Sequence, residues 1–511
     1  MDGVGLDPGG LSRDRLARMR SAVATLYVAA LAGCHLVSGL SEFERGAGGG
    51  ASSGAAGGGT TSGGGGPEGG GGSGMGGGVP GGELLWATSF SSDSHERGRA
   101  LAMAPGEVVV TAAFYGTVEL DMPGQAISSA GGTQDAALIR LDPATGAVVG
   151  QPTSVGGAGE ELPQAVAVGP DGSTYLCGSY RDTFTFAGTT TIDPGSDVDA
   201  GFVVAWGPSG DPRWLRTFNS PGQDFARCHA VVADGTGVYV AGYFTDTLTW
   251  AGTSQTGPGK SGFVAKLGVD GMAQEVTVLD ASGGAVDIHG IALAGPGRPV
   301  ISGELEGSVG GAFDLPFVGS GRDLFVVQLD DGLMPVWQRV IGGPGDQEGE
   351  WVSANGAGAV VVGAIYTETL SVLGNHPSVD GQEAAVVAFD AQGEPRWVRT
   401  FVGTGDERMR SVYVDAAGET FVALGFEGSI AFDGRTANAE QTDVLVARLS
   451  SDGDVAWHVH FGGPEFDIPW GIAERDGVVA VTGEYRHPVT VLDVPLQDGD
   501  SSNWWVAAFT R

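Results

Sequence analysis

Short runs of alternating hydrophobic and polar residues follow one another along the chain from residue 83 onward. Typical runs are VYVAGYF at 238–244, DLFVVQLD at 323–330, DVLVARLS at 443–450 and VVAVTGEY at 478–485. Val, Phe, Tyr and Trp in period-two runs bounded by Gly and Asp are typical of β-strands. No stretch after residue 46 has a clear apolar period of 3.6 residues, so the pattern predicts an all-β fold.

A repeat of about sixty residues organises these runs. Trp337, Trp397 and Trp457 are spaced 60 and 60 residues apart, and Trp214 and Trp86 precede them at intervals of 123 and 128 residues, which are two steps each. The two skipped steps carry Val149 and Val276 at the Trp position. Seven steps are therefore present, and a fixed period of this length is the signature of a repeat architecture.

Each repeat contains the same four predicted strands. A Gly-rich acidic turn precedes a short first strand, and a second strand such as 238–244 follows; a long polar connection then leads to a third strand such as 323–330. An Asp/Gly turn finally precedes the Trp strand, PRWLRTF at 212–218 or PRWVRTF at 395–401. Four antiparallel strands per repeat, arranged radially, predict a seven-bladed β-propeller over residues 83–511.

The two ends of the repeat region complement each other. After Trp457 only three strands remain, at 470–474, 478–485 and 504–510, whereas the first strand, 84–90, has the Trp-strand pattern and lacks partners. Pairing the N-terminal strand with the last blade completes that blade and removes two exposed edges. Glycines on the second strands are expected to permit close packing of the blades: Gly178, Gly242, Gly303, Gly363, Gly425 and Gly483.

This pattern resembles the SBBP repeat, the seven-bladed β-propeller repeat of bacterial surface proteins. The resemblance covers residues 83–511, and its most specific part is a Gly-Gly-x-Gly-Asp turn followed by a Val-Tyr-Val-x-Gly strand. Two repeats depart from it by losing the Trp, and Ser261 stands where other repeats carry an acid before the third strand. The resemblance implies a surface-exposed module without an established catalytic role.

The N-terminus has the features of an export signal. Arginines at 13, 15, 18 and 20 precede an apolar run over 22–32, which is too short to cross the ~30 Å hydrocarbon core of a bilayer. The run ends in Leu-Ala-Gly-Cys at 31–34 and resembles the lipobox of bacterial lipoproteins, which implies cleavage before Cys34 and diacylation of its sulfur. The alternative is a buried cysteine in an ordinary amphipathic helix. Because the basic residues begin late, translation starting at Met19 is a further possibility.

The expected organisation is thus a signal peptide (1–33), an anchor segment (34–45), a Gly-rich disordered linker (46–82) and the propeller (83–511). The linker contributes to the 92 glycines of the 511-residue chain and contains too few large apolar side chains to form a core. Together these features predict a protein anchored by lipid in the cell envelope, at the outer membrane and facing the periplasm or the cell surface. The formal net charge of −35 disfavours nucleic acid as a partner.

One aligned position varies more than its surroundings. The residue that enters each first strand differs in chemistry from repeat to repeat, although the strands themselves agree: Arg99, Gln164, His229, His289, Glu350, Arg410 and Trp470. First strands line the central channel of a propeller, so these side chains are expected to surround one mouth of it. Polar groups with one Trp suit recognition of a sugar or a peptide. The alternative is a ring of solvated rim residues without a ligand.

Acidic residues recur just before the first strands: Glu160, Asp224, Asp346, Asp406 and Asp467. Such a set is a weak candidate for Ca²⁺ binding, because the ion takes several oxygen ligands. Capping of each turn separately is favoured, since residues on different blades lie too far apart to share one ion. No His-Glu-x-x-His or Cys-x-x-Cys motif is present, and no metal or other cofactor is predicted.

The chain has three cysteines, Cys34, Cys177 and Cys228. The latter two fall on adjacent predicted blades, where either a disulfide or two buried thiols fit an exported protein. No set of residues typical of a catalytic site stands out, so the sequence favours a binding or scaffold module for a glycan or protein ligand over an enzyme. The alternative is an exported hydrolase or lyase acting on polysaccharide, for which Glu350 with Arg99 or Arg410 is the candidate set.

Overall fold

The structure, a computed structural model, describes residues 81–511 except 93, 121–125, 192–193, 195–197, 221–224, 282 and 498–500. The chain divides into two units, Met1–Gly77 and Gly78–Arg511, and the described residues all belong to the second. Cys34, the predicted signal peptide and most of the predicted linker therefore lie outside the described residues. No helix among the described residues is long and apolar enough to cross a bilayer.

All the elements assigned within the described residues are β-strands, and they form antiparallel sheets, so the all-β prediction is confirmed. The first four-stranded sheet contains β2 (Arg97–Ala104), β3 (Glu107–Phe114), β6 (Asp135–Leu141) and β7 (Thr153–Val155). The second contains β8 (Glu161–Val168), β9 (Thr174–Tyr180), β12 (Ala200–Trp206) and β13 (Pro212–Phe218). The third contains β14 (Ala226–Ala233), β15 (Val238–Trp250), β16 (Thr253–Leu267) and β17 (Ala273–Leu279).

The second half of the described chain repeats this arrangement. The fourth sheet contains β18 (Ala285–Leu293), β19 (Pro299–Glu306), β20 (Asp323–Leu329) and β21 (Pro335–Ile341). The next four strands are β22 (Gln347–Ala354), β23 (Val360–Tyr366), β26 (Glu383–Phe389) and β27 (Pro395–Gly403). They are followed by β28 (Glu407–Val414), β29 (Thr420–Phe432), β30 (Arg435–Leu449) and β31 (Val455–Phe461). A short pairing of β27 with β29 joins these two sets into one eight-stranded sheet.

The last four-stranded sheet combines both ends of the described chain. It contains β32 (Asp467–Arg475), β33 (Val478–Tyr485), β36 (Asn503–Thr510) and, beside β36, β1 (Leu84–Phe90). The predicted pairing of the strand at 84–90 is therefore present, with Ala87 opposite Ala507 and Phe90 opposite Trp504. Small hairpins extend four of the units: β4 (Thr117–Glu119) with β5 (Ala126–Ser128), β10 (Thr185–Phe186) with β11 (Thr189–Thr190), β24 (Thr369–Ser371) with β25 (Asn375–Pro377), and β34 (Thr490–Val491) with β35 (Val494–Pro495).

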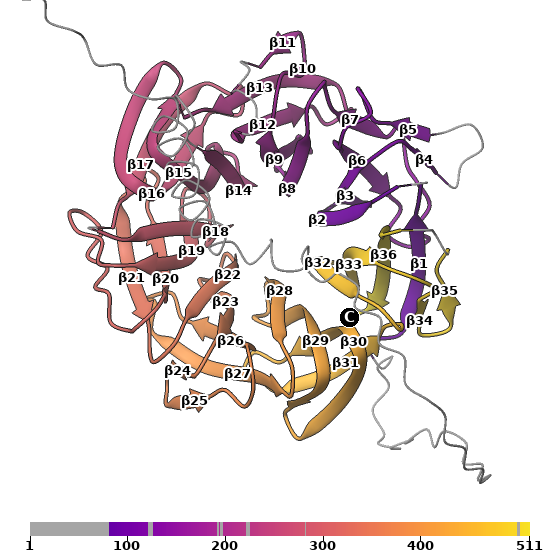
Figure 1. Cartoon of the computed structure of the whole chain (residues 1–511), viewed down its shortest axis with the longest axis vertical. Helices are drawn as coiled ribbons and strands as arrows, with labels where there is room; N and C mark the ends of the chain where they lie inside the picture. The colour runs from indigo at the N-terminus through magenta and orange to yellow at the C-terminus, as the bar shows by residue number, and fades with distance from the viewer. Residues whose placement is uncertain are drawn as a thin grey trace, which may run out of the picture. The chain divides into compact units, whose positions relative to one another are not determined.

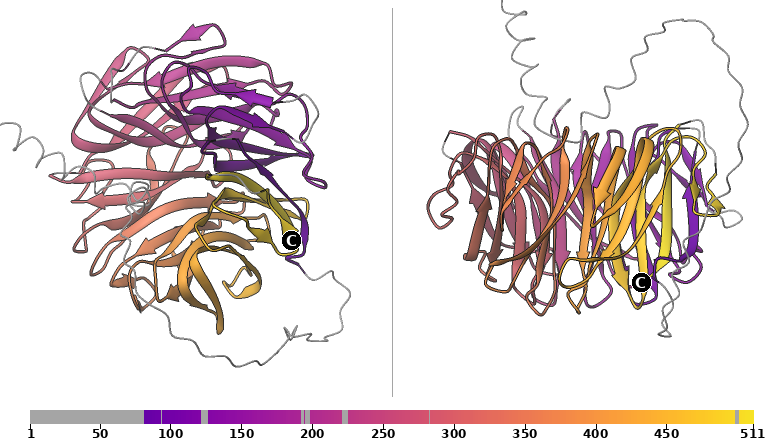
Figure 2. Two further views of the ribbon diagram at one scale, coloured as in Figure 1. Left: turned by 45° about the vertical axis from the view of Figure 1, so that its right-hand side comes forward. Right: turned by 90° about the horizontal axis from the view of Figure 1, so that it is seen from below.

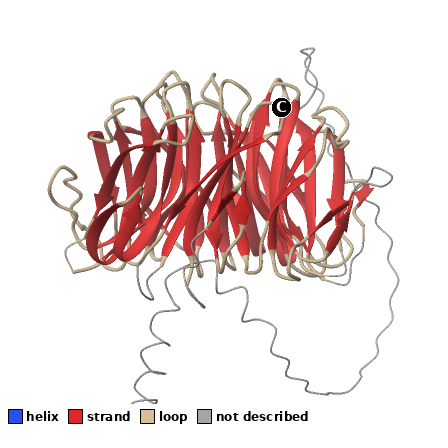
Figure 3. Cartoon of the chain, turned by 90° about the horizontal axis from the view of Figure 1, so that it is seen from above, coloured by secondary structure: helices blue, strands red, loops and turns tan. Residues whose placement is uncertain are grey.

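The sheets of the described unit stand around a common axis in the manner of a β-propeller (Figure 1). Each four-strand set is called a unit below, and its first strand is the innermost: β2, β8, β14, β18, β22, β28 or β32. Each of these first strands contacts the next, and β32 contacts β2. The strands run between two faces on which the loops gather (Figures 2 and 3).

The hydrophobic cores lie between neighbouring units. One cluster joins Val203 and Phe218 of the second unit to Val240 and Phe263 of the third. Another joins Trp504 and Phe90, which belong to opposite ends of the described chain, and their ring centroids are 4.7 Å apart. Because each sheet buries both faces against its neighbours, the strands read as near-continuous apolar runs near their middles.

The sixty-residue Trp period has a packing cause. Each of five Trp rings lies against a glycine with positive φ in the turn before the fourth strand of the next unit. The pairs are Trp86 with Gly146, Trp214 with Gly271, Trp337 with Gly393, Trp397 with Gly453, and Trp457 with Gly82. An added Cβ at any of these glycines would lie only 2.4–3.1 Å from the ring, and the backbone conformation is one that glycine adopts without strain.

Three of the five rings also donate a hydrogen bond across the boundary between units. Trp86 Nε1 donates to Pro143 O at 2.9 Å, Trp214 Nε1 to Val269 O at 3.0 Å and Trp397 Nε1 to Ser451 O at 2.9 Å. The indole therefore supplies apolar area and a satisfied polar group at the same boundary. The Trp is thus a connection between units rather than part of the core of its own unit.

Candidate functional site: a ring of bulged side chains

All seven variable residues singled out in the sequence occupy the same structural position, a β-bulge in the first strand of their unit. The register between the first and second strands shifts at each of them, so the strand pairing skips one residue per unit: Arg99, Gln164, His229, His289, Glu350, Arg410 and Trp470. A bulge re-aims a side chain and is common beside functional sites. The sequence aligned these residues correctly, but it did not reveal the bulge.

Glycines on the second strands make room for four of these bulges. An added Cβ on Gly178, Gly242, Gly303 or Gly483 would lie 1.9–2.1 Å from a carbonyl oxygen of the first strand. That carbonyl belongs in each case to the residue two positions before the bulged one, for example Asp287 O against Gly303. These glycines were expected to let blades pack closely, and they in fact let the bulged strand approach its partner within one sheet. The glycines on the second strands and the variable residues on the first strands are therefore both part of the β-bulge.

Trp470 lies between two arginines that belong to the neighbouring units. The guanidinium carbon of Arg410 is 4.6 Å from the centre of the indole ring, and that of Arg99 is 4.9 Å away. Indole Nε1 donates to Glu484 Oε1 at 3.1 Å, and Glu484 also pairs with Arg97 at 3.4 Å. Trp470 is only 8% exposed, so little of its ring is open to a ligand. Burial together with Arg408 lowers the pKa of Arg410 to about 10.

Histidine and carboxylate groups continue the ring through the third, fourth and fifth units. The rings of His229 and His289 are 5.5 Å apart, and His289 Nδ1 is 3.7 Å from Glu350 Oε2. Burial opposes protonation of His289, but Asp287 and Glu350 outweigh it and raise its pKa to about 9. Burial lowers the pKa of His229, so the two neighbouring imidazoles differ in charge near neutral pH.

The structure therefore brings six of the seven predicted residues into one continuous arc. Ring contacts, ion pairs or charge interactions join them in the order His229, His289, Glu350, Arg410, Trp470 and Arg99. Gln164 occupies the seventh bulge, in β8, and is half-buried. Positive and negative side chains occupy different parts of the arc, with arginines near Trp470 and carboxylates around His289. A ligand at this ring would meet hydrogen-bond donors on one side and acceptors on the other.

Sequence reasoning missed the charged residues that support this ring. Five charged residues surround His289 and Glu350: Asp287, Glu304, Lys260, Arg322 and Glu348. Arg322 forms ion pairs with Glu348 at 2.6 Å and with Glu304 at 3.4 Å. A signal was available, because the residue two positions before the bulge is charged in five units: Arg97, Arg227, Asp287, Glu348 and Arg408. Residues two apart on a strand share a face, which explains why both sets meet.

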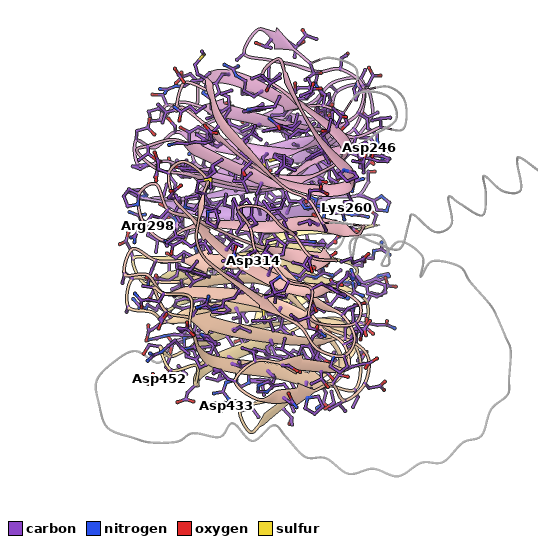
Figure 4. All side chains as sticks on the ribbon, turned by 90° about the vertical axis from the view of Figure 1, so that its left-hand side faces the viewer. Asp246, Lys260, Arg298, Asp314, Asp433 and Asp452 are labelled. Atoms are coloured by element: carbon purple, nitrogen blue, oxygen red, sulfur yellow. The ribbon has the colours of Figure 1, made fainter. Side chains whose placement is uncertain are left out.

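Three of these residues have the composition of a metal site. Ligand atoms of Asp287, His289 and Glu304 lie within 4.8 Å of one another, and Asp287 is opposite Glu304 across β18 and β19. However, Lys260 Nζ is 2.5 Å from Asp287 Oδ2, and it supplies the positive charge that a metal ion would bring. Lys260 and His289 hold the pKa of Asp287 low despite the burial that opposes it. Figure 4 places Lys260 toward one face of the ring.

The candidate Ca²⁺ residues are dispersed and mostly paired with arginine. Glu160 lies 3.1 Å from Arg181 Nη1, Asp346 lies 3.1 Å from Arg322 Nη2, and Asp406 lies 3.6 Å from Arg408 Nη2. Asp346 Oδ1 and Asp406 Oδ1 also accept backbone N–H bonds of the adjacent turn, from Arg322 and Gln382. Asp224 lies outside the described residues. Asp467 is fully buried and occupies the position of Glu407 rather than that of Asp406.

Cys177 and Cys228 are free and buried in the described structure. Cys177 Sγ lies 3.7 Å from the backbone oxygen of Cys228, so the two thiols line one boundary between units. Burial is the main cause of the raised pKa of Cys228, and a protonated thiol is a poor nucleophile. Both cysteines therefore fill the core between β9 and β14.

A separate cavity of about 360 Å³ lies between the fifth and sixth units. Trp397, Asp390, Arg396 and Asp452 contribute to its lining. Asp452 lies toward the opposite face from Lys260 in Figure 4, so this cavity is remote from the ring of bulged side chains. It adjoins the turn on which the Trp397 ring packs.

Comparison with known proteins gives distant structural likenesses. No family model matches the chain, and no curated protein matches it. Solved structures similar to it include a phage phi92 endosialidase (8% identity, 84% of this chain, 69% of that chain, TM-score 0.41). Others are a Dyadobacter fermentans protein of unknown function (12%, 68% and 93%, 0.37) and a Synechocystis apocarotenoid oxygenase (11%, 76% and 95%, 0.37). Likenesses this distant carry no information about activity.

Proposed function

We propose that the seven four-strand units together form a closed, seven-bladed β-propeller that serves as a ligand-binding module of the cell envelope. Three observations support the architecture: the seven-step Trp period, the unbroken series of contacts among first strands, and the pairing of β1 with β36. Trp457 against Gly82 adds the same inter-unit contact at the point where the two ends meet. The SBBP-type repeat pattern agrees with this proposal.

The anchor is the second part of the proposal. The basic N-terminal segment, the short apolar run and Leu-Ala-Gly-Cys at 31–34 support export and acylation of Cys34. Two acyl chains give stable membrane attachment where one does not. The propeller is then held at the outer membrane, facing the periplasm or the cell surface.

Replacing Cys34 by Ser is expected to abolish incorporation of radiolabelled fatty acid and to leave the precursor uncleaved. A serine hydroxyl cannot replace the thiolate that forms the thioether to the lipid. Labelling in a bacterial host followed by gel analysis measures both effects, and Cys228→Ser is the control that retains the lipobox. Normal acylation of Cys34→Ser would contradict the anchor.

The ring of bulged side chains is the proposed binding site, and a glycan chain end is the proposed ligand. The observation that carries this proposal is the bulge itself, which recurs in all seven units while its side chain changes from unit to unit. Arg99, Arg410 and Trp470 are 5–8% exposed, which favours a slender ligand over a broad protein surface. Donors and acceptors on opposite sides suit hydroxyl groups, and the net charge of −35 disfavours a strongly anionic ligand.

Arg410→Ala and Glu350→Gln are expected to weaken glycan binding at least tenfold, because each removes charged hydrogen-bonding groups worth roughly 1.5–3 kcal/mol. Glu350→Gln keeps the shape of the side chain, so its melting temperature should stay close to that of the parent protein. Arg213→Ala, at an exposed arginine that pairs with Asp211 outside the ring, is the matched control. Glycan-array screening followed by titration of one hit measures the effect. Unchanged affinity in the Arg410 and Glu350 variants together would place the site elsewhere.

One observation favours a second candidate, a glycan hydrolase or lyase. Burial, with Glu304 and Glu350 nearby, raises the pKa of Glu348 to about 8 although Arg322 lies 2.6 Å away and opposes this shift, so Glu348 can carry a proton beside Glu350 near neutral pH. Such a pair supplies a proton donor and a base. Product analysis on any bound glycan distinguishes the two functions, because a binding module releases no shortened product. In that case no rate of product release exists for Glu348→Gln to change.

A further inference from the structure

Two buried positions meet at every boundary between units. The first opens the third strand of one unit, or lies at the equivalent point inside the longer strands β16 and β30. The second lies three residues before the bulge in the first strand of the next unit. At four boundaries the main chain of the second position, at Glu161, Ala226, Gln347 and Glu407, donates a hydrogen bond to the residue just before the first position. At the boundary formed by the two chain ends, Glu96 N donates in the same way to Ser502 O. The side chains at these positions are therefore directly comparable around the ring.

Three boundaries carry a carboxyl group at both positions. The pairs are Asp135 with Glu161, Glu383 with Glu407, and Asp443 with Asp467. All six side chains are buried, at 0–6% exposure. Six such carboxylates in an apolar boundary would carry an uncompensated charge that proteins normally avoid.

The contacts of the pair on β26 and β28 show how that charge is reduced. Glu383 accepts backbone N–H bonds from Val379 at 2.5 Å and from Gly403 at 3.0 Å, so it is held as the acceptor. Glu407 lies within hydrogen-bonding reach of Glu383, and the Gly403 N–H that acts to lower its pKa also donates to Glu383 at 3.0 Å, so the two carboxyl groups share that one backbone donor. Two carboxylates cannot hydrogen-bond to each other unless one of them carries a proton.

The boundary between the fourth and fifth units carries an amide at the position of Glu407. Gln347 is fully buried, and its Nε2 donates to Pro344 O at 2.9 Å and to Thr369 O at 3.3 Å. This position is therefore occupied by a hydrogen-bond donor where the side chain is an amide. A carboxyl group of the same shape can donate there only in its protonated form.

The remaining boundaries follow the same rule. Asn503 stands opposite Glu96, an amide with an acid, while Ala200 stands opposite Ala226 and Ser261 opposite Val286. Acid at one position thus occurs only with acid or amide at the other, and small or apolar residues occur together. The two positions act as a pair, which an independent capping role for each acid does not explain.

We propose that each of the three carboxyl pairs holds one proton in the folded protein, so that the ring binds three protons at the boundaries between its units. The proton remains on Glu161, Glu407 or Asp467, and on Glu407 it completes the hydrogen bond to Glu383. Each pair therefore contributes a stabilisation that grows as the pH falls toward the ordinary pKa of a carboxyl group.

The surroundings of the three carboxyl groups agree with this assignment. Burial is the largest cause in each case, and it raises the pKa of Glu161 to about 9, of Glu407 to about 10 and of Asp467 to about 8. The titratable groups that face Glu407 are Glu383, Asp406 and the Tyr366 hydroxyl. Those that face Glu161 are Asp135, Asp182 and Glu160, and those that face Asp467 are Asp443 and Glu465. His460 Nε2 lies 2.7 Å from Asp443 Oδ2. Each facing carboxylate raises the pKa further.

The direction of the pH effect follows from these shifts. An unfolded carboxyl group titrates near pH 4, whereas the folded one keeps its proton up to pH 8–10. The stabilisation is complete below pH 4 and is lost as pH rises through the folded pKa. Between pH 5 and pH 8 each pair should therefore change the unfolding equilibrium constant about tenfold per pH unit.

Glu407→Gln in the full-length protein tests the proposal, since it copies the amide found at Gln347. The ratio of unfolding constants of parent and variant should change about tenfold per pH unit between pH 5 and pH 8, with the variant gaining stability at the alkaline end. Chemical denaturation at each pH measures the ratio. The infrared band of a protonated carboxyl group, present in the parent at pH 7, should lose intensity in the variant.

The reverse change, Gln347→Glu, is the matched control, because it creates a fourth acid pair with Asp323 and should steepen the pH dependence. Parallel pH profiles for parent and Glu407→Gln would overturn the proposal. A parent protein that is stabilised by Ca²⁺ and destabilised by a chelator, with neither effect in Glu407→Gln, would also overturn it and identify a cation as the occupant. A variant that fails to fold leaves the infrared band of the parent at pH 7 as the deciding measurement, and absence of that band rejects the proposal.

Discussion

Deleting Leu84–Phe90 from the full-length chain is expected to abolish cooperative folding or to lower the melting temperature by tens of degrees. The deletion removes the partner of β36, and it removes Trp86 and Phe90 from a core in which they are 8% and 2% exposed. Loss of two such side chains costs about 3–5 kcal/mol each. A typical domain is stable by only about 5–15 kcal/mol, so little stability remains. Circular dichroism melting and analytical ultracentrifugation measure the loss and the aggregation that an open strand edge promotes.

A deletion of residues 46–77 is the control for this experiment. It removes more residues but almost no large apolar side chains, and it keeps Gly81 and Gly82, which lie against Trp457. Its melting temperature should match that of the parent. Equal losses in the two deletions would mean that β1 contributes nothing specific, and the proposal of a ring closed by the N-terminal strand would be withdrawn.

Trp214→Ala is expected to destabilise the protein by about 3–5 kcal/mol. The ring is 7% exposed, lies against Gly271 of the next unit, and donates its N–H to Val269 O at 3.0 Å. The substitution removes the apolar area, leaves a cavity at the boundary and strips that carbonyl of its donor. Urea unfolding of parent and variant gives the difference in free energy.

Val276→Ala is the matched control, because Val276 occupies the Trp position of the third unit and is only partly buried. It should cost about 1 kcal/mol. Gly271→Ala approaches the same contact from the other side, since the new Cβ would lie 2.6 Å from Trp214 Cδ2 and φ is +76°. If Gly271→Ala in the Trp214→Ala background cost as much as in the parent, the ring and the glycine would not be coupled.

Several features of the fold followed from local patterns. Period-two runs of Val, Phe and Tyr identified the strands because successive side chains of a strand point to opposite faces of the sheet. The Trp spacing indicated the unit length because, in five of the seven units, one ring packs on the equivalent turn of the next unit. The unmatched strand at 84–90 indicated the pairing with β36, since an unpaired edge is costly and a partner was missing at the other end.

The candidate site was found only in part. Alignment of the repeats identified Arg99, Trp470 and the other five residues, because a position whose chemistry varies within uniform strands stands out. It could not show that two guanidinium groups lie 4.6 Å and 4.9 Å from the centre of the Trp470 ring, because those groups come from other units. Nor could it reveal that Lys260 lies beside Asp287, since the two side chains belong to different sheets.

The acid pairs, likewise, could be recognised only in part from the sequence. Asp467 looked like a turn residue because it follows a Gly-rich segment, as Asp406 does, and only the register of β32 with β33 places it with the buried Glu407. Its partner, Asp443, lies on another unit. Burial, which raises its pKa, is a property of the assembled boundary and has no local signature in the sequence.

The sequence by itself determined the strands, the repeat length, the variable residue of each unit and the candidate lipid anchor, because each depends on neighbours within a few positions or on a fixed period. The tertiary structure alone decided which charges meet, which groups lie close to the Trp470 ring and which carboxyl groups lose contact with water. Those outcomes depend on packing one unit against the next, where a side chain's partner is about sixty residues away and its solvation is set by both units together.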